Sequence, residues 1–251
     1  MQELKSKYPI LIVLACWEGI SRLGLVSSQY LPPFTQCLGF IYGLALSGEI
    51  FIHIRDSMIR ALGGYFLSLV IGIPLGITMG LFRSVEKPLS PVVSLFYPIP
   101  KVTLIPLLIL WLGLGDRSKI AIVFLACLLP ILISSRSGAK NVDLRQIWSA
   151  KIMGTGDHQL LRHVILPSAL PFIFSGMRIA LAISLIMLFS IEMLGAQSGL
   201  GYLIIVALES VRPEMMFGGI LVIAVVAYTC DRILLLIRKR LLFWHTEQSA
   251  F

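Results

Sequence analysis

The sequence predicts an all-α integral membrane protein, with about six transmembrane helices that form a single domain over residues 1–251. Apolar residues account for 57% of the chain and charged residues for 14%, well below the roughly 25% charged residues of a soluble domain. The mean hydropathy is +0.90. The apolar residues fall into blocks close to or above the roughly 18 to 20 residues that cross about 30 Å of hydrocarbon as a helix.

The predicted spans cover residues 9–25, 61–82, 95–114, 120–135, 172–194 and 215–237. We expect the first span to be peripheral to a core over residues 61–237. Its Glu18 and Arg22 stand four residues apart, so they can neutralise each other on one helix face. The segment 115–119 predicts a tight hairpin between the third and fourth spans.

Small residues and prolines mark the middle spans. Every fourth position of the second span is small, a spacing that lets another helix approach closely (Ser68, Gly72, Gly76, Gly80). Pro74 predicts a kink in the same span, and further prolines interrupt the third and fourth (Pro98, Pro100, Pro106, Pro130). So many prolines favour irregular helices around a cavity, with lipid-facing kinks of no function as the alternative.

Few charged side chains fall inside the later spans. Arg178 lies near the start of the fifth span, where it can snorkel, and Asp231 is followed by Arg232. Glu192 is an unpaired acid near the outer end of the fifth span, which makes it a functional-site hypothesis. The cysteines are scattered (Cys16, Cys37, Cys127, Cys230), so neither a zinc site nor a disulfide framework is expected. The histidines are isolated outside the spans and are expected to be solvated (His53, His158, His163, His245).

Positive charge orients the chain. Lysines and arginines gather before the first span, between the second and third, between the fourth and fifth, and after the last (Lys5, Lys7, Arg83, Lys87, Arg136, Lys140, Arg145, Lys151, Arg162, Arg238, Lys239, Arg240). The positive-inside rule therefore places both termini in the cytoplasm. The net charge of +8 follows from this topology, so no binding of nucleic acid is expected. A cleaved signal peptide at the N-terminus is less favoured than a retained first helix, since the rest of the chain is membrane-embedded.

A charged, glycine-containing loop over residues 141–171 separates the fourth and fifth spans on the cytoplasmic side. Asp143 and Gln146 fit a capping box, which predicts a short helix from Leu144. Apolar residues recur with helical spacing and predict one apolar face (Leu144, Ile147, Trp148, Ile152). Gly154 and Gly156 then end the helix. The periodicity alone leaves two uses open, namely lying on the bilayer or docking into a partner's groove.

The loop motif Ala150-x3-Gly154-x9-Val164-x-Leu166-Pro167 resembles the EAA loop of permease subunits in binding-protein-dependent ATP-binding-cassette importers. The chain also resembles the branch that serves nitrate, sulfonate, taurine, bicarbonate and thiamine-precursor uptake. This likeness lies at residues 99–120, Leu31-Pro32, Arg60-x2-Gly63, Pro171-x4-Gly176-x-Arg178 and Glu192-x5-Ser198-Gly-Leu-Gly-Tyr-Leu203. The chain departs from the motif at Trp148-Ser149, where the family has Glu-Ala.

The resemblance implies a division of labour in a bacterial inner (plasma) membrane. Two permease chains, a homodimer here, would form the path for a small polar, anionic solute among membrane lipid. Two separate ATPase subunits would dock beneath them and bind ATP-Mg, and an extracytoplasmic solute-binding protein would deliver the solute. The chain itself would bind no cofactor and no metal. The resemblance implies that the ATPase-coupling residues lie on the short cytoplasmic helix (Leu144, Ile147, Trp148, Ser149, Ala150, Lys151, Ile152, Gly154).

Two other classes of protein compete with this interpretation. An ATPase-independent secondary transporter or channel would need inverted repeats and intramembrane coupling residues, and the two halves show no repeat. A membrane-embedded enzyme has no supporting motif. No phosphate-binding G-x4-G-K-[ST] occurs, so the chain cannot bind ATP by that route.

The segment after the fifth span predicts an outer gate. It contains three glycines, which permit backbone conformations that other residues resist (Gly195, Gly199, Gly201). The apolar run 203–208 is too short to cross the membrane and predicts a re-entrant or interfacial piece. We therefore expect Gln197, Ser198 and Tyr202 beside the solute's route, with Glu192 just below. A plain extracytoplasmic connector is the alternative.

Overall fold

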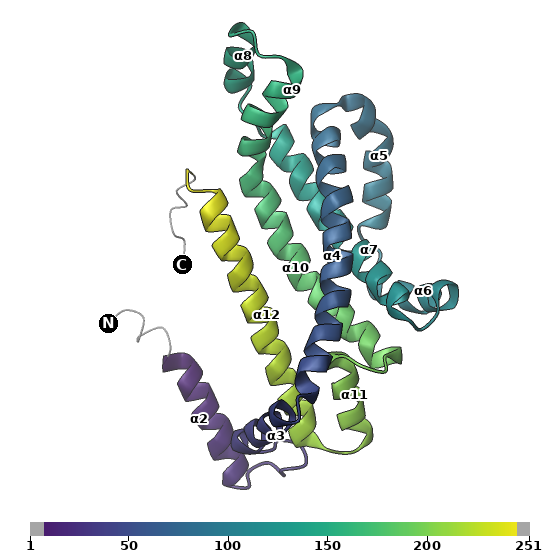
Figure 1. Ribbon diagram of the computed structural model, residues 1–251, viewed down its shortest axis with the longest axis vertical. Coiled ribbons are helices and arrows are strands. Elements are labelled where there is room, and N and C mark those ends of the chain that lie inside the picture. The colour runs from purple at the N-terminus through teal and green to yellow at the C-terminus, as the bar shows by residue number, and fades with distance from the viewer. Residues whose placement is uncertain (1–7, 245–251) are drawn as a thin grey trace. The chain divides into compact units, whose positions relative to one another are not determined.

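A computed structural model describes residues 8–244 of the chain, so the predictions for Lys5, Lys7 and His245 lie outside the described residues. All regular structure in the described range is helical, which confirms the predicted fold class (Figure 1). The chain divides into two compact units, one of Met1–Ser57 with Phe189–Val226 and the other of Met58–Leu188 with Ala227–Phe251. Three long helices contribute residues to both: α4 (Glu49–Leu81), α10 (Leu166–Gly195) and α12 (Pro213–Leu241).

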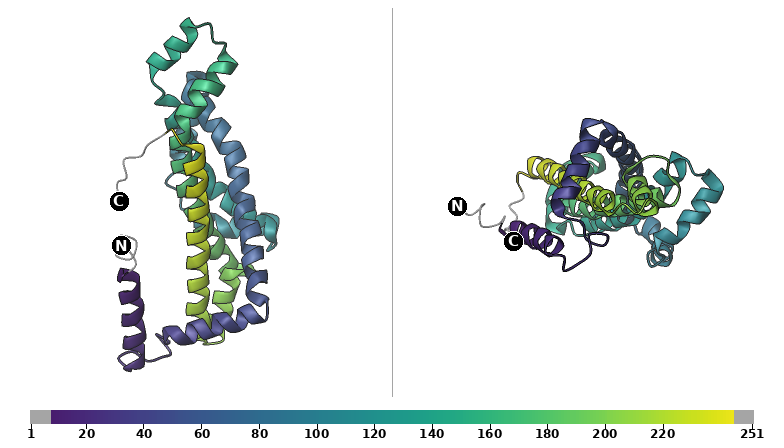
Figure 2. Two further views of the ribbon diagram at one scale, coloured as in Figure 1. Left: turned by 60° about the vertical axis from the view of Figure 1, so that its left-hand side comes forward. Right: turned by 90° about the horizontal axis from the view of Figure 1, so that it is seen from below.

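The first unit begins with α2 (Tyr8–Arg22) and a helix that the hydropathy blocks did not predict, α3 (Phe34–Leu46). Figure 2 shows α3 running crosswise to α2. Glu18 accepts from Arg22 at 2.6 Å, as predicted, and also from the backbone N–H of Thr35 at 3.1 Å, so it ties the two helices together. The short helix α11 (Leu200–Glu209) completes this unit, whose core contains Ile50, Leu200 and Val222.

The second unit is built on a close pair of helices, α4 and α7 (Asp116–Lys140). Glycines of α4 face α7, and a Cβ added at Gly72 would lie 3.0 Å from Ile131 Cγ2. A Cβ at Gly80 would lie 2.7 Å from Ala139 Cβ. Ser68 is fully buried in the same helix. The predicted close approach at every fourth position is therefore confirmed, because only small side chains fit between these two backbones.

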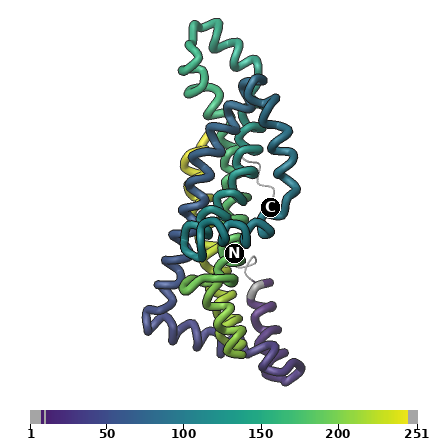
Figure 3. Tube along the Cα trace, turned by 90° about the vertical axis from the view of Figure 1, so that its right-hand side faces the viewer, coloured from purple at the N-terminus to yellow at the C-terminus, as the bar shows by residue number. Residues whose placement is uncertain are grey.

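The predicted third span, 95–114, is wrong as a single helix. Helix α5 (Arg83–Phe96) is followed by the 3₁₀ turn η1 (Lys101–Leu104) and α6 (Ile105–Leu112), and the chain bends by 88° between them. Figure 3 shows this break in the chain trace. Pro98 and Pro100 lack the N–H groups that would continue α5. Lys101 Nζ donates instead to the carbonyls of Phe96, Tyr97 and Ile99 at 2.7 to 3.0 Å.

Four of the described helices are long and apolar enough to cross a membrane, or five if the bent pair forms one span. They are α4, α7, Asp157–Gly195 and α12. Helices α2, α3 and α11 are shorter than these. Helix α4 begins at Glu49, twelve residues before the predicted start at 61, and it carries charged residues that concealed its first turns in the hydropathy pattern (Arg55, Asp56, Arg60). The span count of six and the orientation stay predictions.

Arg178 does not snorkel freely. Its guanidinium forms a bidentate ion pair with Asp231. Nε donates to Oδ1 at 2.7 Å, and a terminal nitrogen donates to Oδ2 at 3.1 Å. Arg232, the sequence neighbour of Asp231, lies over the ring of Tyr228 instead, 4.7 Å from its centroid. The ion pair of Arg178 with Asp231 joins α10 to α12 within the second unit. It is a strong contact, because the planar guanidinium and carboxylate groups match in geometry.

Candidate functional site

Helix α8 (Leu144–Ile152) lies where the sequence predicted the cytoplasmic helix. Its N-cap is Asp143, whose Oδ1 accepts from the backbone N–H of Arg145 at 2.9 Å. At the other end, the N–H of Gly154 bonds to the carbonyl of Lys151 at 3.0 Å, and that of Thr155 to the carbonyl of Ala150 at 3.1 Å. These two bonds form a Schellman motif, which requires a left-handed residue, and Gly154 has φ +81°. Both ends of α8 are therefore fixed locally.

The apolar residues of α8 point in two directions rather than forming the single face that the periodicity predicted. Leu144, Trp148 and Ile152 are exposed, with 67, 65 and 84% of their surface accessible. Ile147 and Ala150 are half-buried and pack against a buried cluster of the second unit that contains Ala139, Val142, Leu160 and Ile165. The exposed residues recur every four positions, so they form a stripe on the outer side of α8. We call Leu144, Trp148 and Ile152 the outer stripe.

The rest of the loop returns the chain to the membrane-spanning helices. It forms α9 (Asp157–Leu160) and the π-helical turn η2 (Leu161–Ile165), which runs directly into α10. Ser168 of α10 donates to the side-chain oxygen of Gln146 in α8 at 3.3 Å. Figure 1 shows α8 and α9 beyond the ends of α7 and α10. Ser149, Lys151 and Gly154 are exposed, so the loop presents these residues and the outer stripe on a folded support.

The second predicted site, around Glu192, is a buried hydrogen-bond network at the start of α11. Glu192 is completely buried and not unpaired as predicted, since its carboxylate accepts from the Ser57 hydroxyl at 2.8 Å and from Gly201 N–H at 3.0 Å. Ser57 Oγ in turn accepts from Leu200 N–H at 2.8 Å. His53 Nδ1 accepts from Gly199 N–H at 3.1 Å. The first N–H groups of α11, which no helical carbonyl can satisfy, are thus bound by three side chains.

Two glycines allow this close contact. Gly199 has φ +122°, and a Cβ there would overlap the carboxylate of Glu192. A Cβ at Gly201 would lie 2.6 Å from the carbonyl oxygen of Phe189 and 2.7 Å from Glu192 Cβ. Gly199 and Gly201 thus let the backbone approach a buried anion closely, and Gly199 does so in a conformation that other residues resist, as predicted.

The other predicted gate residues differ in exposure. Gln197 is exposed, whereas Ser198 and Tyr202 are half-buried. Ser198 donates to Asp56 Oδ2 at 2.7 Å, and the ring of Tyr202 lies 6.1 Å from that of His53. His53 is itself buried, so its predicted solvation is wrong. His53 and Ser57 were missed because the span was predicted to begin at 61; their four-residue spacing was the available signal.

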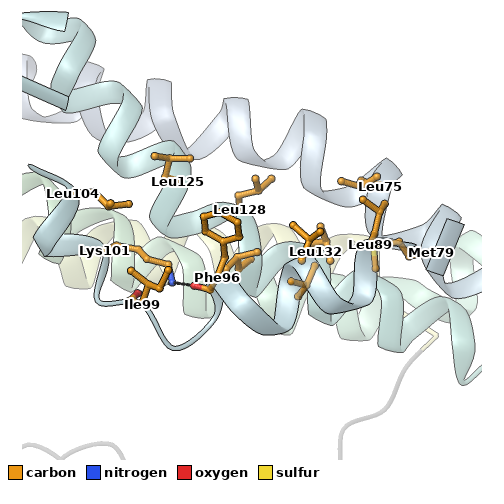
Figure 4. A pocket seen from close by; sticks show the side chains of 13 residues that line it. Leu75, Met79, Leu89, Phe96, Ile99, Lys101, Leu104, Leu125, Leu128 and Leu132 are labelled. Carbon is orange, nitrogen blue, oxygen red and sulfur yellow. Dashed lines mark hydrogen bonds between the residues drawn. The ribbon is translucent and has the colours of Figure 1, made fainter. Parts of the chain in front are cut away.

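The bend after α5 borders two cavities of the second unit. One, of about 290 Å³, is almost wholly apolar and is lined by residues of α4, α5 and α7 together with Lys101 (Figure 4). The other, of about 460 Å³, is lined by Tyr97, Pro130, Ser134 and apolar residues of α7 and α10. Ile99, Lys101 and Leu129 border both. Within residues 8–244, no group of three or more His, Cys, Asp or Glu side chains is placed to hold a metal ion.

Comparison with known families decides the class of protein. The family described as "Binding-protein-dependent transport system inner membrane component" matches residues 72–242. This chain belongs to that family. The permease is thus the inner-membrane component of an importer that works with a solute-binding protein and separate ATPase subunits, rather than an enzyme.

Relatives cover nearly the whole permease. The taurine transport system permease protein TauC of Escherichia coli is 34% identical over 94% of this chain and 88% of its own. The SsuC protein of Bacillus subtilis, described as a transport permease for aliphatic sulfonates, is 36% identical over 95% and 87%. The riboflavin transport system permease protein RibX of Chloroflexus aurantiacus is 31% identical over 95% and 89%. Permeases of different solutes therefore share this sequence pattern.

A solved structure supports the fold of the permease. An inward-facing MetNI methionine ABC transporter contains a chain that superposes with a TM-score of 0.59 at 19% identity. The match covers 76% of this chain and 96% of that one. At this identity the likeness concerns the helical architecture alone.

Proposed function

We propose that two copies of this permease form the translocation path of an importer for small organic sulfonates such as taurine. Two relatives named for taurine and aliphatic sulfonates, TauC and SsuC, support this substrate class, because each aligns with at least 94% of the chain. RibX, which is named for riboflavin, aligns almost as fully, so the substrate has to be tested directly.

The outer stripe of α8 is the surface for the ATPase. Its three large apolar side chains are exposed, and the predicted orientation puts them on the cytoplasmic side, where a partner that covers them is favoured. Buried aromatic anchors dominate such interfaces. Ser149, Lys151 and Gly154 would border the contact, while Ile147 and Ala150 would transmit movement of α8 to the packed core of the second unit. ATP-Mg would be bound and hydrolysed on the ATPase.

The start of α11 is the receiving end for the solute. Gln197 is exposed there, and Ser198 and Tyr202 follow it on a backbone that Glu192 holds. Cysteine at Gln197, in a variant without the four native thiols, should react with a charged thiol reagent from outside, and trapping nucleotide on the ATPase should change the reaction rate. An unchanged rate, with transport intact, would leave this segment as a plain connector.

Reconstitution tests the function as a whole. Proteoliposomes that contain the permease, its ATPase and its binding protein should take up radiolabelled taurine or ethanesulfonate only when ATP is supplied on the side of the membrane that carries the ATPase. The permease alone is the matched control and should give no uptake. ATP-independent uptake by the permease alone would establish the secondary-transporter alternative, and uptake of riboflavin but of neither sulfonate would refute the substrate class.

A further inference from the structure

A polar cavity of about 250 Å³ lies in the first unit, next to the network that holds the start of α11. Its volume is slightly below the roughly 300 to 1,000 Å³ found for sites of drug-sized molecules, so it suits only a small solute. Four of its lining side chains carry polar groups, and they come from three parts of the unit (Glu49, His53, Tyr202, Arg212). Leu44, Met215 and other apolar residues complete the wall.

The hydrogen-bond network at the start of α11 fixes which ring nitrogen of His53 carries the proton. Its Nδ1 accepts a hydrogen bond from Gly199 N–H, so the neutral ring carries its proton on Nε2. Nε2 faces Glu49, with 4.0 Å between Nε2 and Oε1. The bond to the backbone of α11 therefore sets the tautomer that presents an N–H donor toward the cavity.

Arg212 brings a positive charge to the same cavity. Its Nε pairs with Glu214 at 3.3 Å, and its guanidinium lies over the ring of Phe40, 5.9 Å from the centroid. Because that ion pair joins Nε, the two terminal nitrogens carry the N–H groups that match an oxyanion in geometry. Glu49 supplies the opposite charge, and its side chain is 60% exposed.

We infer that this cavity binds a small zwitterion, an aminosulfonate. The sulfonate would accept hydrogen bonds from Arg212, His53 Nε2 and the Tyr202 hydroxyl, and the ammonium would pair with Glu49. A cavity lined by a carboxylate as well as a guanidinium disfavours a simple anion, since the carboxylate repels it, and favours a ligand that carries both charges. This inference rests on the proposed function and narrows its substrate class from sulfonates to those with an amino group.

Equilibrium binding to the permease–ATPase complex in nanodiscs, without the binding protein, tests the inference. Radiolabelled taurine should bind the wild-type complex. Ethanesulfonate, which lacks the ammonium, should compete about fivefold less well, which is the upper end of the range for a partly exposed ion pair. Glu49→Gln should weaken taurine binding by about fivefold and leave ethanesulfonate unaffected or improved. Arg212→Gln should weaken both ligands about tenfold, the effect of a lost charge-assisted hydrogen bond.

Matched controls separate the cavity from general charge effects. Glu209→Gln and Arg55→Gln change exposed residues of the same unit that do not line the cavity, and both should bind as the wild type does. Absence of taurine binding, equal binding of taurine and ethanesulfonate, or equal effects of Glu49→Gln and Glu209→Gln would overturn the inference. Uptake measured with the binding protein tells the two proposals apart, because sulfonate uptake that persists in any of these cases leaves the proposed function standing.

Discussion

Helix α8 and the start of α11 differ in which residues cap them and in which side chains they expose. The helix α8 is capped by its own neighbours and leaves the three apolar side chains of the outer stripe exposed. The start of α11 is capped by side chains from two other helices, and its charged member, Glu192, is fully buried. Exposed apolar surface gains free energy only when a partner covers it, whereas the hydrogen bonds of a buried carboxylate already contribute within one chain. The outer stripe of α8 therefore has no apolar partner within the described residues, whereas the start of α11 is held by hydrogen bonds inside its own unit.

The largest effect should follow the loss of Glu192. Glu192→Ala leaves Ser57 and Gly201 N–H without their buried acceptor, so unfolding in detergent should become easier by about 3 kcal/mol. Glu209→Ala, at an exposed acid of the same unit, should change the free energy of unfolding by less than about 0.5 kcal/mol. If Glu192→Ala instead unfolds like the wild type but no longer transports, Glu192 belongs to the path and the contrast between the two regions disappears.

The next effect should come from the backbone that Glu192 holds. Gly199→Ala forces a Cβ toward the carboxylate of Glu192 at a φ that L-residues avoid, and we expect a loss of about 2 kcal/mol in the free energy of unfolding. Combining Gly199→Ala with Glu192→Ala should cost less than the sum of the two single changes, because the clash is then relieved. Additive losses would show that the two residues do not interact.

Two neighbouring residues of α8 should separate binding from folding. Trp148→Ala should weaken ATPase binding by about 2 kcal/mol, or about thirtyfold in Kd, with no change in unfolding, because its side chain is exposed. Ile147→Ala should have the opposite pattern. It should lower the free energy of unfolding by about 2 kcal/mol, because Ile147 packs on the core, and should affect ATPase binding less than Trp148→Ala does. Co-purification and detergent unfolding measure the two quantities, and the same pattern in both variants would contradict the division of α8 into two faces.

The smallest effect should lie at the end of α8. Gly154 and Gly156 both have open space where a Cβ would be added, but only Gly154 has positive φ. Gly154→Ala should therefore cost about 1 kcal/mol and weaken ATPase binding by loosening the last turn, while Gly156→Ala, whose φ is −72°, should be nearly neutral. Equal binding by the two variants would show that the Schellman end is not required for docking.

The sequence predicted local features well and distant pairing poorly. The start of α8 at Leu144, its glycine stop and the small-residue face of α4 were correct because they depend on capping chemistry and on periods within one helix. The pairing of Arg178 with Asp231 and the burial of His53 were missed, since each needs a residue on another helix. Glu192 was found as a candidate but was judged unpaired, because its partner Ser57 lies 135 positions away in the chain.

The glycine face of α4 also limits how the second unit can move. Added Cβ atoms at Gly64, Gly76 and Gly80 would lie within 2.7 Å of side-chain carbons of α7, so the two helices fit in one register only. Sliding α4 by one residue along its axis, about 1.5 Å, would bring full side chains to the places where only hydrogens fit. Shear between α4 and α7 is therefore disfavoured, and we expect any rearrangement of the second unit to carry this helix pair as a rigid body.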